Sequence, residues 1–344
     1  MVSKKKAPSR KSINLALQGG GAHGAFAWGT IDAILEDGRI DIEAISATSA
    51  GAMNAVVLAD ALTDGDAGHA RERLTKFWRA IANAGEVYSP VKPMRDIFGN
   101  TLPVEQSPFY WMFDTMLRVF SPYQLNPYNF NPLRQVLEEQ IDFDKLRRTR
   151  GIQVHLCATN VETGKVRIFE RAELTPDTVL ASACLPILFQ TIEIDGSHYW
   201  DGGYIGNPAI FPLIYGSKSR DVMIVHINPI VRHGVPKTAP EILNRINEIS
   251  FNSSLMREMR AIAFVTRLIE QNKLDPSEMK QMLIHSIRAD EIMTAHSVGS
   301  KLNPDWQFLC GLRDSGRDVT QRWLNAHVDD IGKRSTVDLE AEFL

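Results

Sequence analysis

Hydrophobic and polar positions along the first sixty residues predict two strand–turn–helix units. An apolar run at 13–17 ends in three glycines and is followed by a helical pattern over 22–35. A second apolar run at 42–45 ends in a turn of small residues, and the pattern over 50–62 is typical of a helix buried on nearly all sides. Strands that alternate with helices indicate an α/β fold with a mainly parallel central sheet.

The rest of the chain continues this pattern around one less regular segment. From 88 to 130 prolines and aromatic residues recur, and we interpret this segment as an insertion over the sheet. A lid, an oligomer contact, a lipid-facing surface and a small core packed under loops all fit its composition. We expect strands at 152–158, 166–169, 190–194, 198–200 and 222–227, and helices at 71–84, 109–120, 132–141, 176–183, 240–270, 275–284 and 314–326.

These elements predict a basic, disordered tail at 1–12, a catalytic domain at 13–235 that includes the insertion at 88–130, and a helical C-terminal extension at 236–344. We expect no secretory signal, because no apolar segment of suitable length follows the basic start. No stretch reaches the ~20 apolar residues that a membrane span requires. The prediction is a cytoplasmic protein, with peripheral membrane contact and homo-oligomers through the insertion or the C-terminal helices left open.

Composition narrows the class of partner. The net charge of −3 gives no electrostatic case for a nucleic-acid partner. The three cysteines, Cys157, Cys184 and Cys310, are odd in number and far apart, which argues against a disulfide framework and against a zinc site. The sequence therefore predicts neither a metal nor a cofactor.

The first candidate for chemistry is the glycine turn, Gly19-Gly20-Gly21-Ala22-His23-Gly24. Glycines between a strand and a helix let backbone N–H groups point outward at the positive end of the helix dipole. Such a turn suits an anion, either a phosphate or the oxyanion of an acyl-transfer intermediate. Gly19, Gly21 and Gly24 also fit a dinucleotide fingerprint. The nearby acids Asp41 and Glu43 precede or open the second strand, whereas a ribose-binding acid should close it.

The second candidate is the serine turn, Ala47-Thr48-Ser49-Ala50-Gly51. A nucleophilic serine between strand and helix needs small residues two positions to either side, because the two elements approach closely there. Ala47 stands where that motif has its first glycine. The alternative is that Ser49 only caps the following helix. Ser46 is the weaker nucleophile because it lies within the strand.

The third candidate is Asp201-Gly202-Gly203, which follows the strand expected at 198–200. Glycines after an aspartate allow its carboxylate to approach another backbone closely, although aspartate and glycine are also common in ordinary turns. None of the nine histidines is placed convincingly as the base of a serine hydrolase. An aspartate that acts directly on serine is the simpler hypothesis, with Asp201 as candidate.

Four blocks in this order give the chain a family resemblance: GGGAHG, ATSAG, ASACLPILF and WDGG. With NFNPLRQVLEEQIDF, they make residues 13–230 similar to the patatin-like acyl hydrolases. The resemblance implies a three-layer α/β/α sandwich that uses a Ser-Asp dyad without a metal to cleave acyl esters of lipids, often phospholipids. It implies Ser49 as nucleophile, Asp201 as general base and the N–H groups of Gly20, Gly21 and Ala22 as the oxyanion hole.

Two positions depart from the family pattern: Ala47 replaces a glycine, and His23 stands where many members have arginine or lysine. We therefore expect a serine acyl hydrolase acting on lipid or other acyl esters. We keep two alternatives: a catalytically silent scaffold of the same fold that binds lipid or a partner, and a nucleotide-binding oxidoreductase.

Overall fold

The computed structural model of the chain describes residues 10–88, 107–275, 279–297 and 299–343. Its strands are β1 (Lys11–Leu17), β2 (Ile40–Ala47), β3 (Gln153–Asn160), β4 (Val166–Glu170), β5 (Ile192–Ile194), β6 (Ser197–Asp201), β7 (Asp221–Val225) and β8 (Leu283–Ile287). They form one sheet in the order β5-β6-β3-β2-β1-β7-β8, with β4 paired to β3. Strands β3, β2, β1, β7 and β8 run parallel to one another. Strands β4 and β6 pair antiparallel with β3, and β5 pairs antiparallel with β6.

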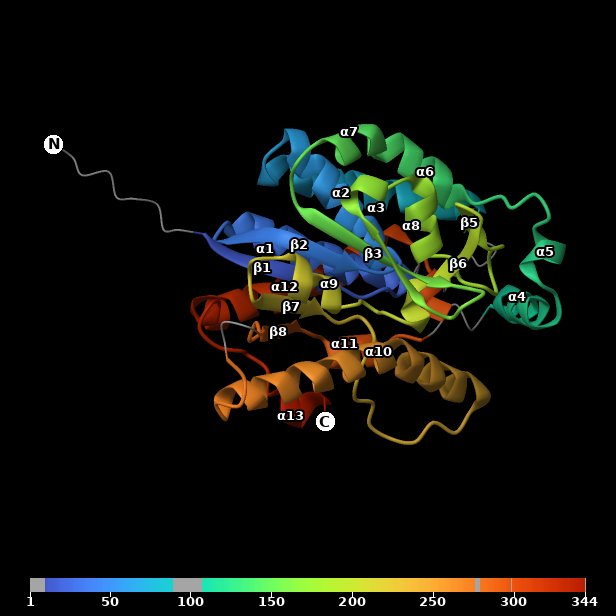
Figure 1. Cartoon of the computed structure of the whole chain (residues 1–344). Coiled ribbons are helices and arrows are strands. Elements are labelled where there is room, and N and C mark those ends of the chain that lie inside the picture. Colours follow the sequence, from blue (N-terminus) through green and yellow to red (C-terminus); the bar gives the residue numbers. More distant parts are fainter. Residues whose placement is uncertain (1–9, 89–106, 276–278, 298, 344) are drawn as a thin grey trace.

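Helices cover both faces of the sheet (Figure 1). The α-helices are α1 (Gly24–Asp37), α2 (Ala50–Asp64), α3 (Ala67–Tyr88), α4 (Pro108–Val119), α5 (Pro122–Leu125), α6 (Pro132–Gln140), α7 (Phe143–Arg148), α8 (Pro176–Ser182), α9 (Phe211–Gly216), α10 (Ala239–Glu270), α11 (Asp290–Thr294), α12 (Trp306–His327) and α13 (Leu339–Phe343). Short 3-10 turns are η1 (Gly21–His23), η3 (Arg171–Glu173), η4 (Gly202–Tyr204), η5 (Gly299–Leu302) and η6 (Val328–Asp330). The expected three-layer sandwich is confirmed.

Strand alternation divides the core into two layers. Leu15 and Leu17 of β1 point into a large cluster with α1, α2, α3 and α12, whereas Ala16 points to the opposite face. There it meets a smaller cluster that includes Leu255 of α10 and Phe343 of α13. Figure 1 shows α10 and α13 together below the sheet, and α2, α3, α6 and α7 above it. The mainly parallel sheet is buried on both faces, as parallel sheets require.

Several expected elements are confirmed with shifted ends, and one is wrong. The first strand begins at Lys11 rather than at residue 13, and the rest of the predicted tail, 1–9, lies outside the described residues. Within the predicted insertion, 89–106 also lies outside them, while α4 confirms the short helix near 109–120. The helix expected at 275–284 is wrong, because the described residues 279–282 are not helical and 283–287 is strand β8. Its residues pair with β7, and a short apolar run does not separate a helix from a buried strand.

The region after residue 235 contributes to the same sheet and core. β8 extends the sheet beyond β7, and α12 packs along α1 on the other side from α10. Gly29 of α1 and Gly316 of α12 allow this contact, since a Cβ at Gly29 would lie 1.9 Å from the Arg313 carbonyl and one at Gly316 would lie 2.1 Å from the Phe26 carbonyl. The helical C-terminal region is therefore packed against the elements that carry the glycine and serine turns.

Candidate active site

The glycine turn leaves β1 at Leu17 and enters η1 and then α1. Gly21 has φ +59, in the left-handed region, and a Cβ there would lie 2.3 Å from the Lys301 carbonyl. The Gly19 N–H donates to Asn207 Oδ1 at 2.7 Å, while the Gly19 carbonyl accepts from Asn228 Nδ2 at 2.9 Å. Gly19 is thereby fixed, which leaves the N–H groups of Gly20, Gly21 and Ala22 as the donors that the turn can offer to an anion.

The serine turn follows β2 and forms a sharp strand-to-helix elbow. Ser49 has φ 56 and ψ −122, a strained conformation for a residue with a side chain, and its side chain makes no capping hydrogen bond to α2. Ser49 thus occupies the N-cap position of α2 without capping the helix through its side chain. A Cβ at Gly51 would lie 2.5 Å from the Leu17 carbonyl, whereas Ala47 fits as a fully buried residue. The elbow tolerates the methyl group of Ala47 and requires Gly51.

Parallel pairing brings the first two turns together. Leu17 pairs with Ala47, so β1 and β2 end side by side at the same edge of the sheet. The approach is close enough that a Cβ at Gly19 would lie 2.6 Å from the Ser49 Cβ, and one at Gly24 would lie 2.5 Å from the Ala50 Cβ. The glycines of the first turn therefore make room for the serine of the second.

The third turn begins at Asp201, the last residue of β6. The Asp201 carboxylate is buried, and its Oδ1 accepts the Gly203 N–H at 2.7 Å. A Cβ at Gly202 would lie 2.1 Å from the Cys157 carbonyl, so the chain must have glycine there. Asp201 thus makes the contact expected of an ordinary turn aspartate, which is the alternative to a catalytic role. Unlike most turn aspartates, it is buried.

Burial raises the pKa of Asp201 to about 6, against opposing effects from three groups. Hydrogen bonds from the Gly203 N–H and from the Ser49 side chain lower it, as does the charge of Lys301. A carboxylate with this pKa is suited to accept a proton near neutral pH. The structure thus brings Ser49, Asp201 and the glycine turn to one place.

Ser182, at the end of α8, joins the second and third turns. Its Oγ accepts the Ser49 N–H at 3.0 Å and donates to the Cys157 carbonyl at 2.7 Å. The Cys184 carbonyl, two residues further, accepts the Asp201 N–H. Sequence reasoning missed Ser182 as a separate residue, although it lies inside the ASACLPILF block.

His23 is the residue of the glycine turn that faces the C-terminal region. Its Nε2 lies 2.8 Å from Ser300 Oγ, and its ring is 5.6 Å from that of His296. Burial holds the pKa of His23 well below its usual value, so the imidazole is neutral at neutral pH. His23 therefore supports the turn and brings no positive charge to it.

The residues expected of a nucleotide site are engaged elsewhere. Glu43 accepts the N–H groups of Lys218 and Ser219, and Asp41 pairs with Arg10. Both acids lie at the start of β2, and the glycine turn lies beyond the paired ends of β1 and β2. They stand at the opposite end of the strands from the turn that a dinucleotide would occupy.

An apolar cavity of about 460 Å³ lies between α4, the segment that follows α8 and η5. Phe113 and Leu117 of α4 line one side, and Leu188 and Phe189, which follow the Ser182–Cys184 segment, line another. Leu302 completes it from η5, next to the lysine whose carbonyl contacts Gly21. The cavity is suited to an apolar group, and η5 connects it with the glycine turn.

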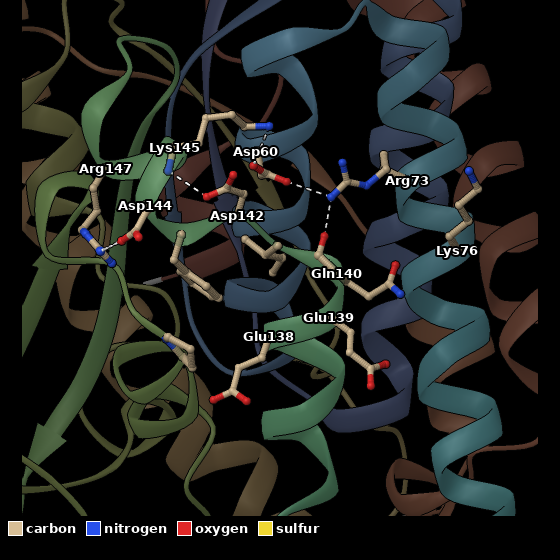
Figure 2. A pocket seen from close by; sticks show the side chains of 13 residues that line it. Asp60, Arg73, Lys76, Glu138, Glu139, Gln140, Asp142, Asp144, Lys145 and Arg147 are labelled. Atoms are coloured by element: carbon tan, nitrogen blue, oxygen red, sulfur yellow. Dashed lines mark hydrogen bonds and ion pairs between the residues drawn. The ribbon is translucent and has the colours of Figure 1, made fainter.

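A second, polar cavity of about 800 Å³ lies between α2, α3, α6 and α7 and is lined by none of the predicted site residues. Figure 2 shows Asp60 there between Arg73 and Lys145. Charged side chains of both signs surround it, as an ion-pair network would. Within the ranges that the structure describes, no group of three or more His, Cys, Asp or Glu is placed to hold a metal, and no helix is long and apolar enough to cross a membrane.

The mixed sheet with helices on both faces and a serine at a strand-to-helix elbow defines a three-layer α/β/α protein. The sequence matches the patatin-like phospholipase family over residues 15–214, more than half of the chain, and the protein belongs to that family. The resemblance inferred from the four sequence blocks is confirmed. Family membership supports a lipid hydrolase activity.

The chain also shows weak similarity to solved structures from two bacterial species. VipD from Legionella pneumophila is 14% identical with a TM-score of 0.40, over 95% of this chain and 72% of that one. ExoU from Pseudomonas aeruginosa, in complex with SpcU, is 14% identical with a TM-score of 0.35, over 92% of this chain and 53% of that one. This chain thus spans about half of that ExoU chain. No curated protein matches the sequence significantly.

Proposed function

We propose that the protein is a serine acyl hydrolase that cleaves fatty acyl esters of lipids through Ser49 and Asp201. The observation that carries this proposal is the strained Ser49, held against Gly19 and within the electrostatic reach of a buried aspartate. Strain of this kind persists in functional turns because the surrounding structure enforces it.

In the proposed reaction, Ser49 Oγ attacks the ester carbonyl carbon while its proton passes to the Asp201 carboxylate. The oxyanion is stabilised by the N–H groups of Gly20, Gly21 and Ala22. Collapse of the intermediate breaks the ester C–O bond, and Asp201 returns the proton to the departing alcohol. Water, deprotonated by Asp201, then attacks the acyl-enzyme, releases the fatty acid and restores Ser49.

The apolar cavity supports a fatty acyl chain as the group that is transferred. Its walls come from α4, from the segment after α8 and from Leu302 of η5, and η5 also packs on the glycine turn. The exposed surface of α4 and its C-cap residue is rich in apolar side chains, namely Trp111, Met112, Met116, Val119 and Phe120, and it also carries Thr115 and Arg118. We propose that this surface contacts a lipid bilayer while the inner residues of α4 line the cavity.

Labelling by a fluorophosphonate probe tests the proposed nucleophile. We expect wild type to be labelled and Ser49→Ala to be unlabelled, with hydrolysis of short and long acyl esters lost in parallel. Ser46→Ala is the matched control, because the Ser46 hydroxyl is buried and donates to the Ala209 carbonyl. Equal labelling of wild type and Ser49→Ala contradicts the proposal. Lipid binding without labelling or hydrolysis favours the silent scaffold.

Cosedimentation with phosphatidylcholine vesicles tests the membrane contact. We expect Val119→Ser combined with Phe120→Ser to reduce the bound fraction, since it removes two exposed apolar side chains of the α4 region. Tyr215→Ser is the control, because Tyr215 is more exposed than either residue but lies on α9 rather than on α4. Equal losses in both variants contradict a contact through α4.

A further inference from the structure

The turn η5 brings a lysine to the glycine turn from outside the part of the chain that matches the family. Lys301 lies beyond residue 214, where that match ends. Its carbonyl would lie 2.3 Å from a Cβ at Gly21, and its own Cβ would lie 3.4 Å away. Ser300, the preceding residue, is bound to His23. The backbone of η5 is thus packed directly on the turn that is proposed to hold the oxyanion.

The Lys301 side chain lies between the glycine turn and the Asp201 turn. Its Nζ donates to Asn228 Oδ1 at 2.8 Å, and Asn228 in turn donates to the Gly19 carbonyl. The same Nζ is 5.7 Å from the centre of the Phe251 ring. That ring would lie 3.2 Å from a Cβ at Gly203, whose N–H binds Asp201. Two short chains of contacts therefore connect Lys301 with both turns.

The charges around Lys301 indicate which negative charge the lysine compensates. Burial lowers the pKa of Lys301 to about 8, opposed by the negative charges of Glu248 and Asp201 and assisted by Arg232. Glu248 is already paired with Arg232 at 2.6 Å and with Arg245 at 3.1 Å. Asp201 has no ion pair with any residue that the structure describes. Asp201 is therefore the negative charge near Lys301 that is otherwise uncompensated.

Among the described residues, three other titratable groups whose pKa responds to Asp201 are uncharged at neutral pH. Burial raises the pKa of Cys157, Cys184 and Tyr204, so all three are protonated there. On the far side of Lys301, His23 is neutral, since burial and the charge of Lys301 both lower its pKa. The cation that acts on Asp201 is thus Lys301 itself.

We propose that Lys301 is a positioning residue, which keeps the Asp201 carboxylate ionised and able to accept the Ser49 proton near neutral pH. This inference rests on the proposed function of Ser49 and Asp201. It gives the C-terminal region a part in the reaction, because η5 holds the lysine in place. A buried carboxylate without a compensating cation takes up a proton at higher pH, and a protonated Asp201 cannot act as base.

The test is the pH dependence of kcat/KM for an uncharged ester, p-nitrophenyl butyrate, from pH 5 to 9. In Lys301→Met, we expect the acidic limb of the kcat/KM profile to shift to higher pH by about one unit, because Asp201 loses a nearby opposite charge. The rate should then fall about fivefold at pH 6 and less than about twofold at pH 8. Lys301→Arg, which keeps the charge, should restore the wild-type limb. Lys273→Met, at an exposed lysine, is the control.

Thermal unfolding identifies variants that fail to fold, and Lys301→Gln replaces Lys301→Met if the apolar side chain is not accepted. An unchanged lower limb in a folded, uncharged variant overturns the proposal. A loss of equal size at every pH also overturns it, because that result indicates a structural or oxyanion role. If wild type neither hydrolyses the ester nor reacts with the fluorophosphonate probe, the proposed function itself fails.

Discussion

Asp60 on α2 and Asp201 at the end of β6 are both buried aspartates, but the protein compensates their charges in different ways. The Asp60 side chain is 1% exposed and lies 2.8 Å from Arg73 and 3.4 Å from Lys145 (Figure 2). Lys145 also binds Asp64, and Arg73 also donates to the Gln140 carbonyl. The network joins α2, α3 and α7 through fixed ion pairs.

Asp201 is equally buried but has only hydrogen bonds within reach. The Gly203 N–H and the Ser49 side chain stabilise its charge, and Lys301 acts from further away. Burial therefore outweighs its partners and raises the pKa of Asp201 to about 6. The comparison shows that the surroundings of a buried carboxylate decide its use. Two adjacent cations favour structure, while incomplete compensation leaves a carboxylate that can exchange a proton.

The largest expected effect separates the two aspartates by activity. Asp201→Asn should lower kcat/KM for an acyl ester by at least about 10³-fold, because an amide cannot take the Ser49 proton. Asp60→Asn should remain within about threefold of wild type at a temperature where it is folded, since Asp60 lines a cavity without site residues. Steady-state hydrolysis measures both. Similar losses of kcat/KM in the two variants would contradict a catalytic role that distinguishes Asp201 from Asp60.

Stability should separate the two aspartates in the opposite sense, with the larger loss expected for the Asp60 variant. Asp60→Asn leaves Arg73 and Lys145 without their shared buried partner, and we expect the free energy of unfolding to fall by about 3–5 kcal/mol. Asp144→Asn breaks the exposed pair with Arg147 and should cost less than about 1 kcal/mol. Urea unfolding at pH 7 measures both. Equal costs would show that burial does not strengthen the Asp60 network.

The sequence predicts the three turns because each depends on residue types that the backbone itself requires. Gly51 is needed because a side chain would strike the Leu17 carbonyl, and Gly21 because of its positive φ. Such requirements are local, so they appear as short motifs at the ends of apolar runs. The parallel order of β1 and β2 then predicts that the first two turns meet. The roles of Ser49 and Asp201 stay predictions.

Contacts between distant parts of the chain leave no such motif. Lys301 and Asn228 reach the glycine turn only through folding of the C-terminal region, and neither lies in a recognisable pattern. The sequence does not predict strand β8 for the same reason, and the helix expected at 275–284 overlaps its first two residues. Its five residues become a strand by pairing with β7, an interaction that the local sequence does not specify.

The pH dependence of stability sharpens the contrast for Asp201. The pKa of Asp201 is about 6 in the folded protein and near 3.8 without burial, so the folded state binds more protons between these values. Stability should therefore fall as pH rises through this window, by at most about 3 kcal/mol. Asp201→Asn removes that cost and should be more stable than wild type at pH 7 and similar near pH 4.

Denaturant unfolding of wild type and Asp201→Asn at pH 4, 5, 6 and 7 measures this difference. Lys301 stays charged over the range, because its pKa is about 8. Its contribution to wild-type stability is therefore nearly constant. A variant that is less stable than wild type at pH 7, by an amount that does not change with pH, would mean that Asp201 serves the fold as Asp60 does.

The smallest expected effect compares the apolar cavity beside α4 with the polar cavity that Asp60 lines. Leu117→Trp should fill part of the apolar cavity and reduce kcat/KM for a dodecanoyl ester relative to a butanoyl ester by about tenfold, since a long chain needs more of that volume. Lys76→Trp, at the exposed rim of the polar cavity, should leave the ratio unchanged. The ratio isolates chain length because both esters undergo the same reaction at Ser49. If Leu117→Trp lowers both rates equally, the residue affects the site itself, and the apolar cavity does not hold the acyl chain.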